Sequence, residues 1–248
     1  MKVNTWHLIA LLAGAFLLSG CASIPPPGKK DPRDRFERVN RSVYRFNTTL
    51  DHAVLRPVAR TYVRVTPSGA RRCVSNFFSN LAYPVTIAND VLQGKGRDGL
   101  SDSARFGINT VVGVGGLFDP ASHWDFQKHD EDFGQTLGKW GVPSGPYLML
   151  PLLGPSTVRD APARVVDHFF SPQGYITDTN TTVALYVSEA ISGRANLLSR
   201  DQLIESAYDP YAFVRNVWLQ RREYQVRDGD VPPDAEPQDD TEKAVPRP

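Results

Sequence analysis

Two histidines and four acidic residues within ten positions form the densest group of side chains that could do chemistry in this sequence. They are His123, Asp125, His129, Asp130, Glu131 and Asp132. Imidazole and carboxylate groups can bind a metal ion or exchange a proton. The histidines are six positions apart, whereas four would align them on one helix face, and adjacent acids point in different directions. The spacing therefore favours a solvated polar loop over a metal site, and we expect no bound metal.

The serines lie in no arrangement typical of a serine hydrolase. A nucleophile elbow has the pattern Gly-x-Ser-x-Gly. The stretch around Ser156 lacks the second glycine, and Ser144 has Val142 where the first glycine belongs. We therefore expect no catalytic residues and no enzyme activity, while a membrane-anchored lipid hydrolase with another arrangement stays open as an alternative.

A glycine-rich stretch at Gly113-Val-Gly115-Gly does not match the dinucleotide fingerprint. Phe118 stands where the third glycine belongs, and no alternating strand precedes it. These glycines predict a turn with close backbone approach, and no cofactor is expected.

The whole chain carries 28 basic and 27 acidic residues, and this near balance does not indicate whether the protein binds a lipid surface. We expect no nucleic-acid partner.

An apolar run of eleven residues, 8–18, ends just before Cys21 and follows Lys2. It is too short to span a bilayer, which takes about 20 apolar residues. It is typical of a cleaved secretory signal, so residues 1–20 are predicted to be removed. Leu18-Ser-Gly-Cys21 resembles the bacterial lipobox, which implies that Cys21 becomes an acylated N-terminus anchored in a membrane. The alternative is an ordinary signal that happens to end in cysteine.

The residue after the cysteine resembles a sorting signal of bacterial lipoproteins. Asp at this position commonly retains enteric lipoproteins on the inner membrane, and here the residue is Ala22. That difference implies an outer-membrane location, lipid-anchored and facing the periplasm.

The remaining chain divides by composition into a tether, one domain and a tail. Residues 21–30 are polar and proline-rich, as expected of a lipidated tether. Residues 228–248 hold seven acids, two bases and five prolines, which predicts a disordered acidic tail. Residues 31–227 amount to one domain. With Cys21 acylated, Cys73 has no disulfide partner and is expected to be a small buried hydrophobe.

Apolar residues recur at helical spacing through most of the domain, which predicts a mostly helical, all-α fold. One amphipathic helix has its apolar face at Phe36, Val39, Val43, Phe46 and Leu50. Further helical faces are predicted within 54–65, 74–81, 85–92, 100–112, 183–191 and 204–218. Pro57 is expected to interrupt one of these helices and Pro84 to end another.

The segment 141–158 behaves differently, because it has eighteen residues without a charge. Its helix breakers are Gly141, Pro143, Gly145, Pro146, Pro151, Gly154 and Pro155. Two interpretations stay open: a loop buried in the core, or a segment embedded in lipid whose backbone polar groups are shielded by protein.

Several blocks of sequence occur in an order that carries a family likeness. They are Asp31-Pro-x-Asp-x-Phe36-Glu-x-x-Asn40-Arg-x-x-Tyr44-x-Phe-Asn47, Leu55-Arg-Pro57-Val-Ala, Gly113-x-Gly-Gly-Leu-Phe-Asp119-Pro and Glu131-Asp-Phe-Gly134-Gln-Thr-Leu-Gly138-x-Trp-Gly141-Val. Together they resemble the MlaA/VacJ family of outer-membrane lipoproteins, over about residues 31–211.

The resemblance implies a helical, ring-like domain embedded in the periplasmic-facing leaflet of the outer membrane, with a central amphipathic channel and trimeric porins as neighbours. It implies that phospholipids misplaced in the outer leaflet are withdrawn and passed to a soluble periplasmic lipid carrier, which maintains lipid asymmetry. It implies no catalytic activity and no cofactor. A structural lipoprotein that braces porins or the envelope is the alternative from another class.

A channel for phospholipid needs polar groups toward its lumen and apolar groups toward the membrane. Polar residues within apolar helices are therefore candidates for the lipid channel: Asn47, Asn76, Asn80, Asn89 and Asn109. Each could equally be a helix cap or a surface residue. The breakers Gly141, Pro143, Gly145, Pro146, Pro151, Gly154 and Pro155 make the uncharged segment our candidate for the pore mouth or its gate.

Overall fold

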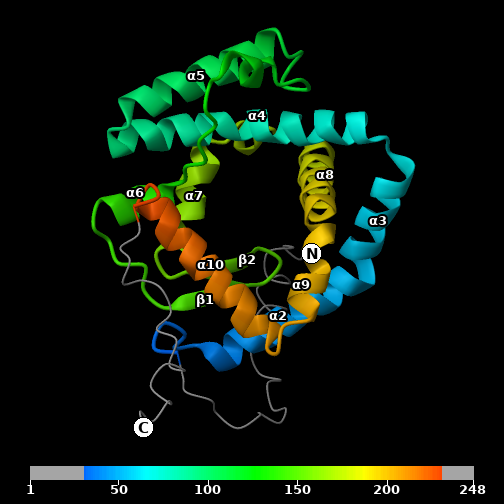
Figure 1. The fold of residues 1–248 in the computed structure, drawn as a ribbon, viewed down its shortest axis with the longest axis vertical. Coiled ribbons are helices and arrows are strands. Elements are labelled where there is room, and N and C mark those ends of the chain that lie inside the picture. Colours follow the sequence, from blue (N-terminus) through cyan, green and yellow to red (C-terminus); the bar gives the residue numbers. More distant parts are fainter. Residues whose placement is uncertain (1–30, 231–248) are drawn as a thin grey trace, which may run out of the picture.

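The computed structural model describes residues 31–230, in which helices follow one another around a ring (Figure 1). The signal segment, Cys21, the tether up to residue 30 and the tail from residue 231 lie outside the described residues. The predicted all-α class and the ring-like arrangement are confirmed.

The elements are short apart from α4 and α8. The α-helices are α2 (Glu37–Leu50), α3 (Arg56–Val65), α4 (Ser68–Gln93), α5 (Gly96–Val111), α6 (Phe133–Lys139), α7 (Asp160–Phe170), α8 (Thr179–Leu197), α9 (Asp201–Glu205) and α10 (Pro210–Val226). A π-helix, η1 (Asp51–Leu55), and three 3-10 helices, η2 (Pro120–Trp124), η3 (Pro172–Tyr175) and η4 (Leu198–Arg200), connect them. The strands β1 (Tyr147–Leu150) and β2 (Gly154–Thr157) form an antiparallel hairpin.

The ring closes through contacts between helices far apart in the sequence. In Figure 1, α4 crosses the top, α3 descends from one end of it, and α2 lies at the bottom. On the opposite side α10 rises to α6, which contacts α4 and completes the circuit. Helix α5 packs along the outside of α4, and α8 packs against α3. The hairpin lies within the ring, against α2.

The prediction that Pro84 ends a helix is wrong, since α4 continues through it to Gln93. A proline inside a helix removes one hydrogen bond and costs about 3 kcal/mol. Helix α4 contacts α5, α6, α7 and α8, and this packing outweighs the local penalty. The helix ends instead at Gly94, which takes the left-handed conformation with φ of 76°.

Two other helix boundaries also differ from the predicted ones. Pro57 lies in the first turn of α3, directly after η1, so the chain stays helical from 51 to 65. The predicted face over 204–218 is divided between α9 and α10. The break has a clear cause, because Asp209 caps α10 by accepting a 3.1 Å hydrogen bond from the Ala212 N–H and is followed by proline.

The uncharged segment forms the hairpin, a β element that its sequence pattern did not predict. Tyr147 pairs with Thr157 and Leu150 with Gly154. Tyr147 and Met149 are buried in an aromatic core with Tyr211, whereas the turn residues Leu152 and Leu153 are 70% and 63% exposed. The segment is therefore neither wholly buried nor wholly exposed, because its strands enter the core and its tip leaves it.

Two asparagines of α2 bind backbone groups of β1 and of the turn that follows it. Asn40 donates to the Tyr147 carbonyl at 3.0 Å and accepts from the Met149 N–H at 2.9 Å. Two helical turns further on, Asn47 donates to the Leu150 carbonyl and accepts from the Leu152 N–H, both at 2.9 Å. These side-chain amides satisfy backbone groups that a third strand would otherwise pair.

We expect Asn40→Ala to lower the free energy of unfolding by about 3 kcal/mol, because Asn40 is only 2% exposed and its loss leaves buried groups of β1 unpaired. Chemical unfolding in detergent micelles measures this change. Ser42→Ala on the same helix is the control, since the Ser42 hydroxyl is exposed and bonds only its own helix. Equal stability of the two variants would contradict the role given to Asn40.

Candidate functional site

The distribution of polar and apolar residues is the reverse of that in a water-soluble globular protein. Within residues 31–230, 18 polar or charged residues but only 7 apolar ones are buried. In the same part of the chain 33 large apolar or aromatic side chains are exposed. Exposed apolar surface on this scale marks contact with a membrane or another apolar partner.

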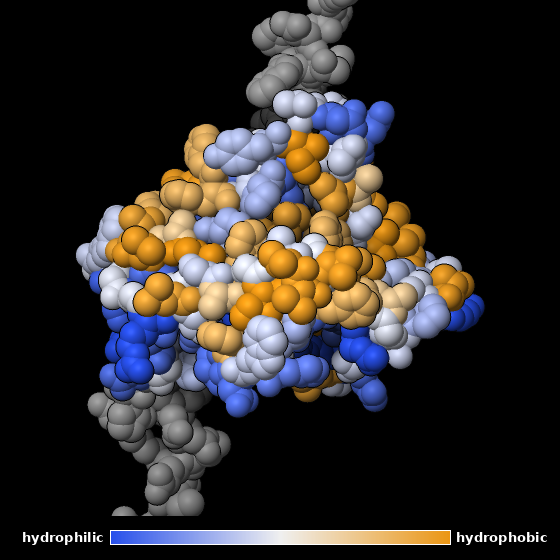
Figure 2. Space-filling model, turned by 90° about the horizontal axis from the view of Figure 1, so that it is seen from above, coloured by the Kyte–Doolittle hydropathy of each residue, from blue (hydrophilic) through white to orange (hydrophobic). Residues whose placement is uncertain are grey.

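Many residues of the apolar faces predicted from the sequence are exposed, although Val43, Tyr211 and Trp218 pack in the core. Phe36, Val39 and Phe46 of α2 are exposed, whereas Asn40 of the same helix is buried. On α5, Leu100 is 75% and Val111 81% exposed. Figure 2 views the molecule from the α5 side, where a band of apolar side chains crosses the face and polar side chains gather along its lower edge. We call these exposed apolar side chains of the helices the rim.

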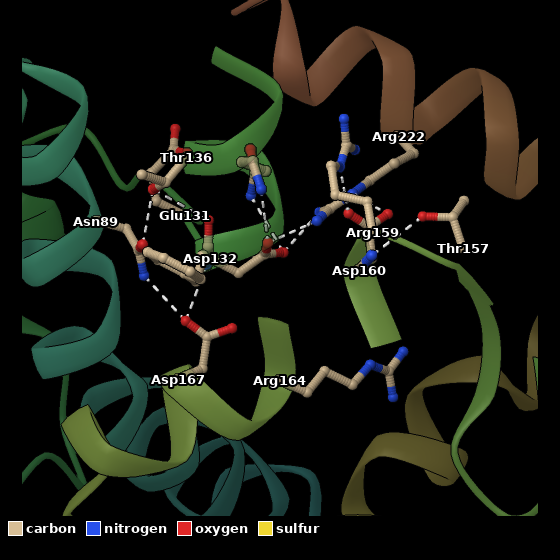
Figure 3. A network of polar contacts seen from close by, with 12 residues as sticks. Asn89, Glu131, Asp132, Thr136, Thr157, Arg159, Asp160, Arg164, Asp167 and Arg222 are labelled. Carbon is tan, nitrogen blue, oxygen red and sulfur yellow. Dashed lines mark hydrogen bonds and ion pairs between the residues drawn. The ribbon is translucent and has the colours of Figure 1, made fainter. Parts of the chain in front are cut away.

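A network of charged side chains links α6, α7 and α10 in the interior (Figure 3). Arg222 of α10 donates to both oxygens of Asp132, each at 2.6 Å, and to Asp160 at 3.0 Å. Arg159 donates to the other oxygen of Asp160 at 2.8 Å. A Cβ atom at Gly134 would overlap Arg222 and Asp160, so glycine is needed where α6 meets this network.

The arginines set the charge state of the two acids. Burial alone would raise the pKa of Asp132, but the hydrogen bonds and positive charge of Arg222, together with hydrogen bonds from Gln135, outweigh it, and the pKa lies below its ordinary value. For Asp160, burial is outweighed in the same way by Arg159 and Arg222. Both carboxylates are therefore ionised at neutral pH, and the network is held together by opposite charges in the interior.

A second set of contacts joins α4 to α6 and α7 beside this network. Asn89 donates to Asp167 at 3.0 Å and accepts from the Thr136 hydroxyl at 2.7 Å. The Phe133 N–H also donates to Asp167, at 2.9 Å. Burial raises the pKa of Asp167 to about 6, and the neighbouring Asp132 adds to the shift. Asn89 thus connects three helices by direct hydrogen bonds.

The glycine-rich turn after α5 is held against α4 by polar contacts. Arg105 donates to both oxygens of Asp119 at 2.9 Å, and Asn109 donates to one of them at 2.9 Å. Asn80 donates to Thr110 at 3.0 Å, and a Cβ atom at Gly116 would overlap Asn80. The predicted turn with close backbone approach is found here, with Gly116 at φ of 87°.

The structure places the five candidate channel asparagines in inter-element contacts, and their role in a channel stays a prediction. Asn80, Asn89 and Asn109 are buried, and Asn47 and Asn76 are half-buried. Asn47 holds the hairpin, and Asn76 donates to the Leu117 carbonyl at 3.3 Å. Asn76, Asn80 and Asn109 also line a small pocket of about 100 Å³ beside α4.

The proposed pore-mouth residues lie in and around the hairpin. Gly145 and Gly154 have positive φ values, 66° and 76°, so a side chain at either would be strained. Pro151 and Gly154 flank the exposed tip at Leu152 and Leu153. The roles of Gly141, Pro143, Gly145, Pro146, Pro151, Gly154 and Pro155 in a gate stay predictions.

The residues of the His and acid group have separate partners, so the predicted solvated loop is only partly correct. His129 pairs with Asp102 at 2.8 Å, and Glu131 pairs with Lys95 at 2.8 Å. Asp132 caps α6 through the Gln135 N–H and binds Arg222. Within residues 31–230, no three His, Cys, Asp or Glu side chains are grouped as metal ligands. Cys73 is half-buried rather than buried.

Sequence reasoning missed Arg215 and Arg222, which are both buried on α10. They are seven positions apart, so they share a helix face, with Trp218 between them. Arg215 binds Asp34 at 3.0 Å, as Arg222 binds Asp160. Buried charges are paired, so two arginines on the face that carries Trp218 were the available signal.

Asp90 of α4 is a buried acid without such a partner. Neither of its buried carboxyl oxygens accepts a hydrogen bond within the described chain. Burial, together with Asp102 and Glu131, raises the pKa of Asp90 to about 7, against an opposing effect of His129. The folded state therefore keeps a proton that the unfolded chain loses near pH 4. The stability that this group contributes is complete below pH 4 and is lost as pH rises to about 7.

We expect Asp90→Asn to remove this pH dependence and to stabilise the protein by about 2 kcal/mol at pH 8, because asparagine resembles the protonated acid. Melting temperatures between pH 5 and pH 8 in detergent test this. The melting temperature of the variant, relative to that of the wild type, should increase as pH rises from 5 to 8. A constant difference across the range would show that Asp90 is already ionised at pH 5.

Three pockets are lined mainly by polar residues. One of about 340 Å³ lies beside the charged network, where Arg164, Arg221, Trp218 and Gln225 join its acids. A second, of about 300 Å³, lies between α3, α4 and α8. The third is the smaller pocket that contains Asn80. These pockets open at the surface and add polar recesses to a molecule whose rim is apolar.

None of the helices within residues 31–230 has the length and apolar character needed to cross a membrane. The exposed apolar rim and the polar, charged interior together define a helical membrane-associated protein.

Comparison with known proteins identifies the family. The family profile described as MlaA lipoprotein matches residues 32–225, and the chain belongs to this family. A relative from Escherichia coli K12, named intermembrane phospholipid transport system lipoprotein MlaA, is 37% identical over 237 residues, which cover 93% of each chain. A relative of the same name from Haemophilus influenzae is 31% identical, over 92% of this chain and 93% of its own.

A solved structure agrees with this assignment. It was reported under the words "Structural basis for maintenance of bacterial outer membrane lipid asymmetry". It superposes with a TM-score of 0.71 at 36% sequence identity, and the match covers 78% of this chain and 98% of that chain.

Proposed function

We propose that this protein removes mislocalised phospholipids from the outer leaflet of the outer membrane and passes them to a soluble periplasmic carrier, so that lipid asymmetry is maintained. The observation that carries the proposal is the combination of an exposed apolar rim with a buried polar interior. A phospholipid has a charged head and apolar chains, so moving it needs both kinds of surface side by side. The names of the relatives support the same activity.

The proposed location is the periplasmic-facing leaflet, with the acylated Cys21 as anchor. Support comes from the lipobox-like Leu18-Ser-Gly-Cys21, Ala22 after it, and the rim on several helices. Apolar helix faces that do not span a bilayer suit a protein lying within one leaflet. Trimeric porins and the soluble carrier are proposed as protein partners, and cross-linking in intact outer membranes tests both.

Deleting the gene should raise the phospholipid content of the outer leaflet, because misplaced lipid is no longer withdrawn. A reporter enzyme that transfers acyl chains only from outer-leaflet phospholipid measures this. Wild-type protein should restore the normal level, and Cys21→Ala should not, because it lacks the anchor. An unchanged outer leaflet after deletion would favour a lipoprotein that only braces porins or the envelope.

A further inference from the structure

The first half of α4 carries an unusually polar face next to the pocket between α3, α4 and α8. Its members recur at spacings of three and one, which places them on one side of the helix. They are Ser68, Arg71, Arg72, Ser75, Asn76 and Ser79. All of these except Ser79 line the pocket of about 300 Å³.

The pocket is basic. Arg71 and Arg72 line it, no acidic residue does, and within residues 31–230 neither arginine has a carboxylate within 4.0 Å. Most other buried or half-buried arginines of the described chain are paired, as Arg105, Arg194 and Arg222 show. Two unpaired guanidinium groups beside one cavity are therefore available to an anionic ligand.

Further donors are present in the same pocket. The Tyr62 hydroxyl is buried and has no hydrogen-bond partner among residues 31–230. Ser68 begins α4, whose N-terminus has no side-chain cap, so its first backbone N–H groups are open. Asn196 and Ser192 of α8 complete the opposite wall. Guanidinium, hydroxyl and amide donors around one space are the groups that bind phosphate.

A second polar pocket lies next to it along α4. The smaller pocket of about 100 Å³ shares Ser75 and Asn76 with it and extends to Ser79 and Tyr83. Lys128 lies there, hydrogen-bonded to Ser79. The two pockets therefore lie side by side along one face of α4, and Arg71 and Arg72 line the larger one.

We propose that Arg71 and Arg72 bind a phosphate ester, the head group of a phospholipid, in the larger of these two pockets. The inference rests on the proposed lipid transport and adds to it a specific head-group site. A volume of about 300 Å³ is too small for a whole phospholipid and suits its head alone, which leaves the acyl chains to apolar surface outside. The exposed Val65 at the end of α3 provides such surface nearby.

The test measures binding to the purified full chain in a non-ionic detergent. The probes are a short-chain phosphatidylglycerol, the matching diacylglycerol without phosphate, and inorganic phosphate. The double variant Arg71→Gln/Arg72→Gln should bind the phospholipid at least about tenfold more weakly than wild type, and its binding of diacylglycerol should be unchanged. Arg60→Gln/Arg64→Gln is the control, since it removes the same charge from exposed positions of α3 outside the pocket.

Three results would overturn the inference. The first is that the Arg71 and Arg72 variant binds the phospholipid with wild-type affinity. The second is that the control variant loses as much affinity for the phospholipid as the Arg71 and Arg72 variant does. The third is that the wild-type protein binds inorganic phosphate more tightly than the phospholipid. If the double variant does not fold, Arg72→Gln alone changes an exposed position and should still weaken binding. Wild-type protein that binds no phospholipid would contradict the proposed function itself, whereas normal binding by the variant would contradict only this site.

Discussion

Arg222→Gln should destabilise the protein by about 3 kcal/mol, because it leaves Asp160 with one partner and Asp132 with no arginine. Arg222 is only 8% exposed, so water does not replace the lost hydrogen bonds. Asp160 is the more deeply buried acid, so its lost partner accounts for most of the destabilisation. Asp132 is partly exposed and contributes less to it. Chemical unfolding in detergent micelles at pH 7 measures the loss.

The neighbouring arginine supplies a matched control. Arg221 is exposed and reaches Asp130 only at 3.7 Å, so Arg221→Gln should change stability by less than about 0.5 kcal/mol. The penalty of Arg222→Gln should also shrink as pH falls from 7 to 4. The pKa values of Asp132 and Asp160 lie below their ordinary values only while arginine is present, so in the variant the acids accept protons more readily. A penalty that does not depend on pH would contradict this explanation.

The double variant Leu152→Asp/Leu153→Asp should abolish lipid transport while leaving folding stability nearly unchanged. Both side chains are exposed at the hairpin tip, so their replacement removes little packing. If the tip meets acyl chains at a pore mouth, as the sequence analysis predicts for this segment, each carboxylate there costs about 2 to 3 kcal/mol. The acyl-transfer reporter measures the expected rise in outer-leaflet phospholipid, and protein level is measured alongside.

Gln202→Glu/Gln220→Glu adds the same two charges at exposed polar positions, and it should transport lipid like wild type. Normal transport by the Leu152 and Leu153 variant would exclude the hairpin tip from the lipid path. A fall in its protein level would instead indicate a structural role of the tip, contrary to its exposure.

Helical periodicity predicted most of the helices, because residues such as Phe36, Val39 and Phe46 repeat at the helix period whichever side they face. It did not reveal that these residues are exposed. Periodicity shows that a helix has two faces, whereas the surroundings decide which face is buried. On α2 the buried Asn40 stands within the apolar repeat, four positions after the exposed Phe36 and three before Val43, so hydropathy alone did not mark it as the buried residue.

The elements that were missed depend on contacts between distant parts of the chain. Helix α4 passes through Pro84 because of its neighbours, and no local pattern contains them. The hairpin has only four residues in each strand, and its alternation is hidden by prolines and glycines. Likewise, the pairing of Arg222 with Asp160 joins residues 62 positions apart, so the charged network could not be assembled from spacing.

The hydrogen bonds of Asn40 and Asn47 connect helix α2 directly to the backbone of the hairpin. Sliding α2 along β1 by a single residue would break four hydrogen bonds together, because both amides match the strand in one register only. Phe46 and Leu50 of the same helix are exposed on the rim. We therefore expect any displacement of α2 to move Leu152 with it, because the Asn47 amide bonds both the Leu150 carbonyl and the Leu152 N–H.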